Sequence, residues 1–106
     1  METYALDERL WNDCSGRPKF FRKDSTFSLL AFSVEAGQRL PEEEFAVHAG
    51  PEAFVVLSGE ISIGTRDGVR DIPAGTVTII DAGEDHYTLN QSGRRATLVS
   101  FGVTAS

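Results

Sequence analysis

The sequence is short of cysteine and of basic residues, and both shortages exclude classes of protein. A single cysteine, Cys14, cannot form a disulfide within the chain, so we expect a reducing compartment, the cytoplasm. Ten Lys and Arg against sixteen Asp and Glu give a formal net charge of −6, and an acidic surface repels phosphates. Nucleic acid and anionic membrane surfaces are therefore not expected as partners.

Long apolar runs and leader segments are also missing. No apolar run approaches the roughly 18 residues that a membrane-spanning helix needs. The first eight residues, METYALDE, contain no basic residue and no apolar stretch, so a secretory signal is not expected. The chain has 106 residues, of which 41% are hydrophobic, and this predicts one small domain with a core of its own.

Turn-forming residues recur along the chain at the spacing of an all-β protein. Between Gly- and Pro-containing turns such as Asp67-Gly68, apolar runs predict strands at residues 27–34, 45–48, 54–63, 69–72, 77–80, 86–90 and 95–103. No ten-residue amphipathic helix separates these strands, which excludes alternating β and α units. The pattern is typical of a β-sandwich or β-barrel.

The N-terminal segment differs from the rest of the chain. Leu6 and Leu10 lie at helical spacing, acidic residues precede Leu10, and Gly16 and Pro18 follow. We therefore predict a short N-terminal arm or helix at residues 1–20 and a single β domain at residues 21–106.

Any site that uses imidazole must be built from the two histidines, His48 and His86. His48 precedes Glu52 by four residues, and each histidine lies at one end of a predicted strand beside a glycine-containing turn. Alternate side chains of a barrel strand point inward. Two histidines and one carboxylate inside a barrel form the facial triad that non-haem Fe(II) prefers, and the same set suits Mn, Ni or Zn.

Two stretches around the histidines have fixed internal spacings, and in these the sequence resembles the cupin family. The motif positions are His48, Glu52 and Gly59 in the first stretch and Gly75, Gly83, His86 and Asn90 in the second. The sequence departs from the family pattern at Ala46, where the first motif has another histidine, and at Asp81, where the second has proline. The resemblance covers residues 37–90 and implies an all-β, cupin-type jelly-roll β-barrel.

The resemblance also implies a metal site. In metal-binding cupins both histidines of the first motif, its glutamate and the histidine of the second motif bind the metal. Three of these positions are retained here, as His48, Glu52 and His86, which implies a site for Fe, Mn, Ni or Zn. On a strand over 44–48, Glu44 would share a face with Ala46, so Glu44 is a candidate substitute ligand.

Each candidate residue also has a structural interpretation. His48 and Glu52 can form a hydrogen-bonded pair, and His86 can donate to a backbone carbonyl or to Asn90. Phe54 is a core residue that can line a ligand pocket. Asn90 is either a pocket residue or a strand-end residue that satisfies backbone groups. Cys14 is expected to act as a small apolar residue rather than as a nucleophile.

Two functions therefore remain open, and both include a small-molecule ligand or substrate. The three retained ligand positions favour a metal-dependent enzyme whose reaction the sequence does not assign. Ala46, in place of a histidine, favours a non-catalytic small-molecule-binding or sensor cupin with a degenerate metal site. Cupins commonly form dimers, and the strand at 27–34, which is apolar on both faces, is the expected interface of a homodimer.

Overall fold

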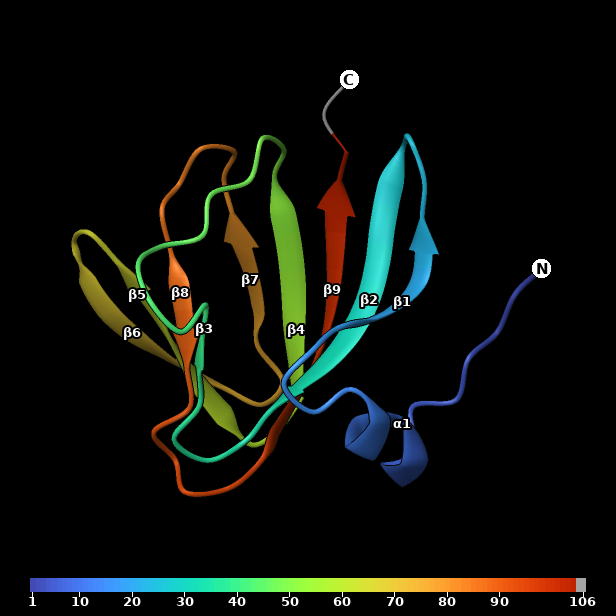
Figure 1. Ribbon diagram of the computed structural model, residues 1–106, viewed down its shortest axis with the longest axis horizontal. Coiled ribbons are helices and arrows are strands. Elements are labelled where there is room, and N and C mark those ends of the chain that lie inside the picture. Colours follow the sequence, from blue (N-terminus) through green and yellow to red (C-terminus); the bar gives the residue numbers. More distant parts are fainter. Residues whose placement is uncertain (105–106) are drawn as a thin grey trace.

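The computed structural model describes residues 1–104 and contains one helix and nine strands (Figure 1). Their bounds are α1 Glu8–Asp13, β1 Lys19–Lys23, β2 Phe27–Val34, β3 Arg39–Leu40, β4 Glu52–Ser58, β5 Glu60–Thr65, β6 Gly68–Pro73, β7 Val77–Ile80, β8 Tyr87–Leu89 and β9 Ala96–Val103. The strands form two antiparallel sheets: sheet A has the order β1-β2-β9-β4-β7, and sheet B has the order β3-β8-β5-β6.

This strand order places segments that are distant in the sequence side by side, as a jelly roll does. β9, the last strand, lies between β2 and β4 and pairs with both along most of its length. The predicted all-β jelly roll is confirmed. Over residues 1–104 no strand ladder joins sheet A to sheet B, so the barrel is not closed by hydrogen bonds.

Most predicted strands have the expected bounds, and one is wrong. β2 and β7 coincide with the predictions at 27–34 and 77–80. The predicted run 54–63 divides at Gly59, whose φ of 75° ends the extended backbone. Residues 45–48 form no strand and make a single bridge, between Ala46 and His86. Glu44, with a φ of 63°, takes the chain out of the extended conformation just before this segment.

The main core lies between the two sheets. Register in sheet A aligns inward-facing residues in rows, so that Leu98 of β9 lies between Phe32 of β2 and Val56 of β4. The buried residues of this core are Val34, Phe54, Val56, Ile61, Ile63, Ile72, Ile80, Ala96 and Leu98. The end of the same space nearer Glu52 is the part that remains open to a ligand, as described below.

A second, smaller core attaches α1 to the outer face of sheet A. Trp11 and Cys14 pack against Ala31 of β2. The carboxylate of Asp7 caps the helix by accepting a hydrogen bond from the backbone N–H of Leu10. The predicted N-terminal helix is therefore present. β1 already begins at Lys19, and the domain boundary after residue 20 stays a prediction.

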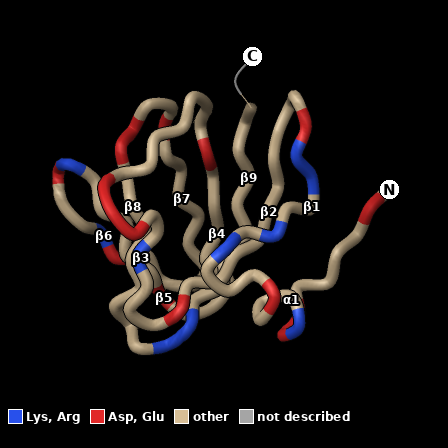
Figure 2. The backbone as a smooth tube through the Cα atoms, viewed as in Figure 1, with Lys and Arg blue, Asp and Glu red and all other residues tan. Residues whose placement is uncertain are grey.

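Charged residues gather in the loops and turns, while the tubes of β7 and β9 are free of charge (Figure 2). No helix within residues 1–104 is long and apolar enough to span a membrane.

Candidate metal centre

The structure brings the three predicted metal ligands together. His48 lies in the loop before β4, Glu52 is the first residue of β4, and His86 directly precedes β8. One ligand atom from each residue lies within 4.8 Å of the ligand atoms of the other two. His86 Nε2 is 4.0 Å from Glu52 Oε1, and the two imidazole rings are 5.4 Å apart between centroids.

His86 is oriented as a metal ligand would be. Its side chain is buried, and its Nδ1 lies 3.1 Å from the carbonyl oxygen of Glu84. Because a carbonyl can only accept, this hydrogen bond requires a proton on Nδ1, so in the neutral imidazole the lone pair belongs to Nε2, the nitrogen that faces Glu52. From the sequence, a hydrogen bond to a backbone carbonyl was the structural alternative to metal binding. In the structure this hydrogen bond orients the His86 ring so that Nε2 faces the cluster.

Backbone hydrogen bonds fix the two loops that carry the histidines. The carbonyl of His48 accepts from Gly83 N–H at 2.9 Å, and Gly83 has the positive φ, 77°, that favours glycine. Ala46 and His86 exchange two backbone hydrogen bonds, of 2.7 and 3.0 Å. The position where the family pattern has a further histidine thus lies beside His86.

The donor set and its geometry fit a divalent transition metal. Two imidazole nitrogens and one carboxylate oxygen suit Fe, Mn, Ni or Zn. With metal–ligand bonds of about 2.1 Å, tetrahedral ligands lie about 3.4 Å apart, so the donors need to approach by an ångström or so. His48 is exposed and can change rotamer to make this approach, whereas His86 is held in place.

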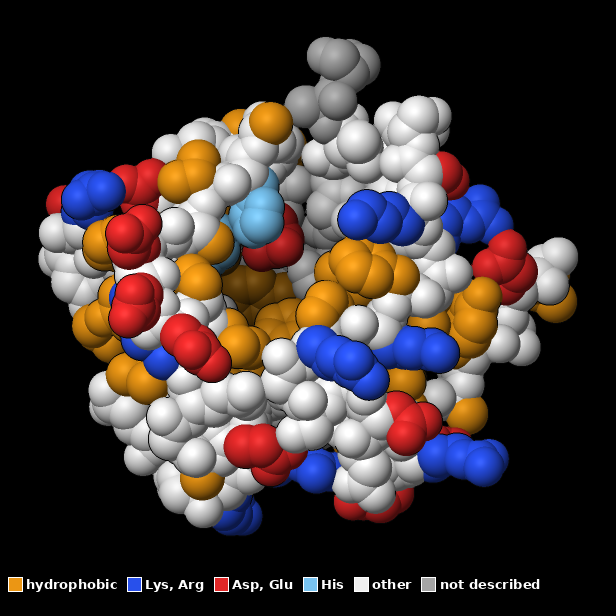
Figure 3. Space-filling model, viewed as in Figure 1, with side chains coloured by type: hydrophobic (Ala, Val, Ile, Leu, Met, Phe, Trp, Pro, Cys, Tyr) orange, Lys and Arg blue, Asp and Glu red, His pale blue; other side chains and the backbone are white. Residues whose placement is uncertain are grey.

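A cavity of about 230 Å³ opens beside the three residues, and His48, Glu52 and His86 line it together with Ala46. Figure 3 shows this hollow, with hydrophobic side chains in its depth and histidine and acidic side chains at its edge. Its apolar walls come mainly from Leu30, Phe32, Leu40, Phe54, Ile80 and Leu98. Phe54, the residue predicted to line a pocket, is one of these wall residues.

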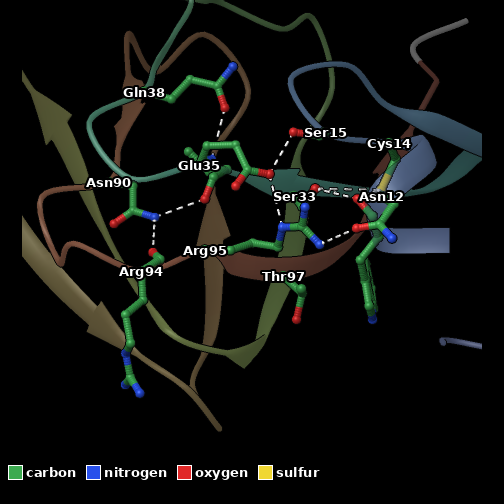
Figure 4. A network of polar contacts seen from close by, with 12 residues as sticks. Asn12, Cys14, Ser15, Ser33, Glu35, Gln38, Asn90, Arg94, Arg95 and Thr97 are labelled. Carbon is green, nitrogen blue, oxygen red and sulfur yellow. Dashed lines mark hydrogen bonds and ion pairs between the residues drawn. The ribbon is translucent and has the colours of Figure 1, made fainter. Parts of the chain in front are cut away.

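Two other predicted site residues lie elsewhere. Glu44 is exposed and lines a separate surface depression with Arg66 and Asp85, because its positive φ interrupts the strand that would have aimed it inward. Asn90 is fully buried and is not among the residues that line the cavity. Its side-chain amide donates to the carbonyls of Val34 and Arg94, at 2.8 and 2.6 Å, so it satisfies backbone groups at the end of β8 (Figure 4).

Several cavity residues were not found from the sequence, and Ser100 and Arg17 are two of them. Ser100 of β9 and Arg17, in the segment before β1, both line the cavity. In the predicted strand at 95–103, a polar residue at an inward-facing position was the available signal for Ser100. Nothing in the sequence connected Arg17 with the histidines.

Cys14 takes no part in this site. Its side chain is buried in the smaller core, and burial raises the pKa of its thiol above the ordinary range. A thiol held in the neutral form is a poor nucleophile, as expected from the sequence.

Comparison with known proteins defines the class to which this fold and site belong. The cupin domain family matches residues 32–102, so the chain belongs to the cupin family. No curated protein matches the chain.

Solved structures agree on the fold. The protein TT1209 from Thermus thermophilus is 20% identical, over 98% of each chain, with a TM-score of 0.80. A conserved protein with a double-stranded β-helix domain from Klebsiella pneumoniae is 18% identical, over 97% of this chain and 91% of that one, with a TM-score of 0.78. The polyketide cyclase RemF from Streptomyces resistomycificus is 18% identical, over 77% of this chain and 57% of that one, with a TM-score of 0.67.

Proposed function

We propose that this cupin binds a divalent transition metal, Fe, Mn, Ni or Zn, at His48, Glu52 and His86, and holds a small molecule against it in the cavity. The observation that carries the proposal is the orientation of His86. Its Nδ1 is engaged by a backbone carbonyl, and its Nε2 faces Glu52 at 4.0 Å, at the edge of an apolar cavity.

Each group in the chain has a distinct part in such a site. A metal with three protein ligands keeps open positions for a substrate, where it supplies Lewis-acid polarisation or dioxygen activation. Glu52 contributes the negative charge, His86 fixes the position, and the apolar walls exclude water from the bound molecule. Apart from these ligands, Arg17 is the one ionisable residue lining the described cavity, so no separate acid or base is assigned.

A second candidate function is a non-catalytic binding or sensor module. The observation that favours it is Ala46, which takes the place of one imidazole beside His86. In that case the cavity binds its ligand without a metal.

Metal titration distinguishes the two functions. We expect the wild-type chain to bind about one equivalent of Zn²⁺, Ni²⁺ or Mn²⁺ by calorimetry, and to bind Fe²⁺ under anaerobic conditions. Metal at a hundred times the dissociation constant should raise the melting temperature by about 10 °C. Glu52→Gln or His86→Ala should weaken binding by about tenfold to a hundredfold or more, since loss of an outer partner alone costs that much.

The matched control is Glu44→Gln, because Glu44 is a nearby carboxylate that lies outside the cluster. It should bind metal as the wild type does. A wild-type protein that retains no metal after dialysis, and whose melting temperature no metal raises, contradicts the metal-binding function and supports the binding module.

A further inference from the structure

Ser100 carries an unexplained polar atom inside the cavity. Its side-chain oxygen is the one buried side-chain oxygen or nitrogen within residues 1–104 that has no hydrogen-bond partner. The residue is 2% exposed and lines the cavity. A buried hydroxyl without a partner costs free energy, so a group that enters the cavity and hydrogen-bonds to Ser100 is stabilised there.

The register of sheet A places Ser100 one inward-facing row away from Glu52, the ligand on β4. Glu52 is aligned with Gly102 on β9, and Phe54, the next inward-facing residue of β4, is aligned with Ser100. Two residues along a strand span about 6.6 Å. A ligand that reaches from the metal centre to Ser100 therefore needs two polar groups about one six-membered ring apart.

The wall that sheet A forms around Ser100 is apolar. Leu30 of β2 and Phe54 of β4 flank Ser100 on the same face of the sheet, and Leu98 lies one step deeper. The body of the ligand is therefore apolar. The cavity of about 230 Å³ is larger than the roughly 150 Å³ that accommodates benzene, so one ring with small substituents fits.

Arg17 places a positive charge on the lining of the cavity. It is exposed, and no carboxylate of the described residues lies within ion-pair distance of it. A divalent cation at the cluster together with Arg17 outweighs the single negative charge of Glu52. The lining of the cavity then attracts anions, although the chain as a whole is acidic.

We propose that the cavity takes a compact organic acid. Its carboxylate lies at the metal centre, its apolar body lies against Leu30 and Phe54, and a second oxygen at its far end exchanges a hydrogen bond with Ser100. The positive charge of Arg17 on the cavity lining adds to the attraction for the acid. This inference rests on the proposed function for the positive charge at the metal centre, whereas the part played by Ser100 does not depend on a metal.

Three probes test the two contacts separately on the full-length chain, with and without Zn²⁺. Benzoate lacks the oxygen for Ser100, 4-hydroxybenzoate has both groups, and 4-hydroxybenzyl alcohol lacks the carboxylate. By calorimetry or NMR titration, we expect the wild type to bind 4-hydroxybenzoate about twofold to tenfold more tightly than benzoate, as one neutral hydrogen bond predicts.

Two variants assign the contacts to residues. Ser100→Ala should abolish the preference for 4-hydroxybenzoate over benzoate, and it should remain folded because it removes no existing hydrogen bond. Arg17→Gln should weaken the binding of benzoate and of 4-hydroxybenzoate by about threefold and leave the binding of 4-hydroxybenzyl alcohol unchanged. The matched controls are Ser58→Ala, whose hydroxyl contacts Thr97 outside the cavity, and Arg70→Gln on β6, and both should behave as the wild type does.

The outcomes separate this inference from the proposed function. Equal binding of benzoate and 4-hydroxybenzoate by the wild type overturns the inference, as does failure of all three probes to bind either form of the protein. Zn²⁺ titrated into the same samples reports on the metal site independently. Metal binding without discrimination between the probes overturns the inference alone, whereas discrimination by the metal-free protein in the absence of metal binding supports Ser100 and contradicts the proposed metal site.

Discussion

At the scale of single residues, Ala46 is the position that most directly limits the candidate metal centre. It is tied to His86 by two backbone hydrogen bonds, and it lines the cavity beside the three ligands. A larger side chain at this position enters the cavity from the wall nearest His86. The site therefore lacks this ligand only because residue 46 is alanine, since the backbone at this position already lies beside His86.

We expect Ala46→His to strengthen metal binding. A third imidazole, beside His86, supplies a fourth protein ligand, and the gain should be about tenfold or more, by analogy with the cost of losing a partner. Zn²⁺ titration by calorimetry measures it. The control is Val47→His, since Val47 is the neighbouring residue, is 55% exposed and does not line the cavity. Equal affinities for the two variants would show that position 46 does not reach the metal.

The residues of the site differ in how far the sequence could reveal them. His48, Glu52 and His86 were predicted because each lies in a short stretch whose spacing from neighbouring glycines matches a cupin motif. Glu44 lies outside the cluster of His48, Glu52 and His86 because its positive φ interrupts the alternation that the prediction assumed. Ser100 was missed because only the pairing of β9 with its neighbours places it on the cavity wall. Arg17 was missed because the segment before β1 meets the cavity only in the folded chain. Neither position can be read from local spacing.

At the scale of elements, a polar cluster attaches the helix and the segment after it to sheet A. Arg95, just before β9, lies 2.9 Å from Glu35 and 2.8 Å from Asn12 of α1 (Figure 4). Ser15 donates a hydrogen bond of 2.6 Å to Glu35. These contacts, first that of Ser15 and then that of Arg95, hold the pKa of Glu35 below its ordinary range.

This lowered pKa predicts a stability contribution that depends on pH. A carboxylate whose pKa is lower in the folded than in the unfolded state stabilises the fold above the ordinary Glu pKa of about 4.3 and loses that effect as pH falls through the folded-state value. We therefore expect Glu35→Gln to lower the free energy of unfolding at pH 7 by less than about 1 kcal/mol, because the group is partly exposed. The difference from the wild type should vanish in acid.

Urea unfolding of both proteins between pH 7 and pH 3 measures this difference. Glu43→Gln is the control, because Glu43 is exposed and forms no ion pair within the described part of the chain. A difference for Glu35→Gln that persists unchanged at pH 3 would mean that the carboxylate charge is not what attaches the helix.

Elements were predictable where the alternation of apolar residues was uninterrupted, as in β2 and β7. Contacts between elements were not predictable in the same way. Gly64 of β5 is an example, since a Cβ there would lie 2.0 Å from the ring of Tyr87 on the neighbouring β8. The requirement for glycine at this position therefore follows from the pairing of β5 with β8 and not from the local sequence.

At the scale of the whole molecule, the outer face of sheet A is an extended apolar surface. Register aligns two uncharged rows across β2, β9, β4 and β7, and their members are Leu29, Phe101, Ala53 and Ile79 in one row and Ala31, Val99, Val55 and Val77 in the other. Trp11 covers Ala31, whereas Ile79 and Val77 are each 67% exposed. Exposed apolar patches of this kind mark sites of association.

We propose that a second copy of the chain covers this surface. Because α1 covers part of the predicted interface at residues 27–34, we propose that the homodimer contact extends from this strand over β9, β4 and β7. In a two-fold contact the same patch meets itself, and two acidic chains can approach there because neither row contains a charge. No desolvated charge then opposes the burial of apolar surface.

We therefore expect light scattering of the wild type at micromolar concentration to give twice the chain mass of 11.6 kDa. Ile79→Lys places a charge within the contact and should give a monomer. Val69→Lys is the matched control, because Val69 is 55% exposed and lies on β6 of the opposite sheet, so this variant should remain a dimer. If the wild type is itself a monomer, or if both variants dissociate alike, the apolar face of sheet A does not join two copies.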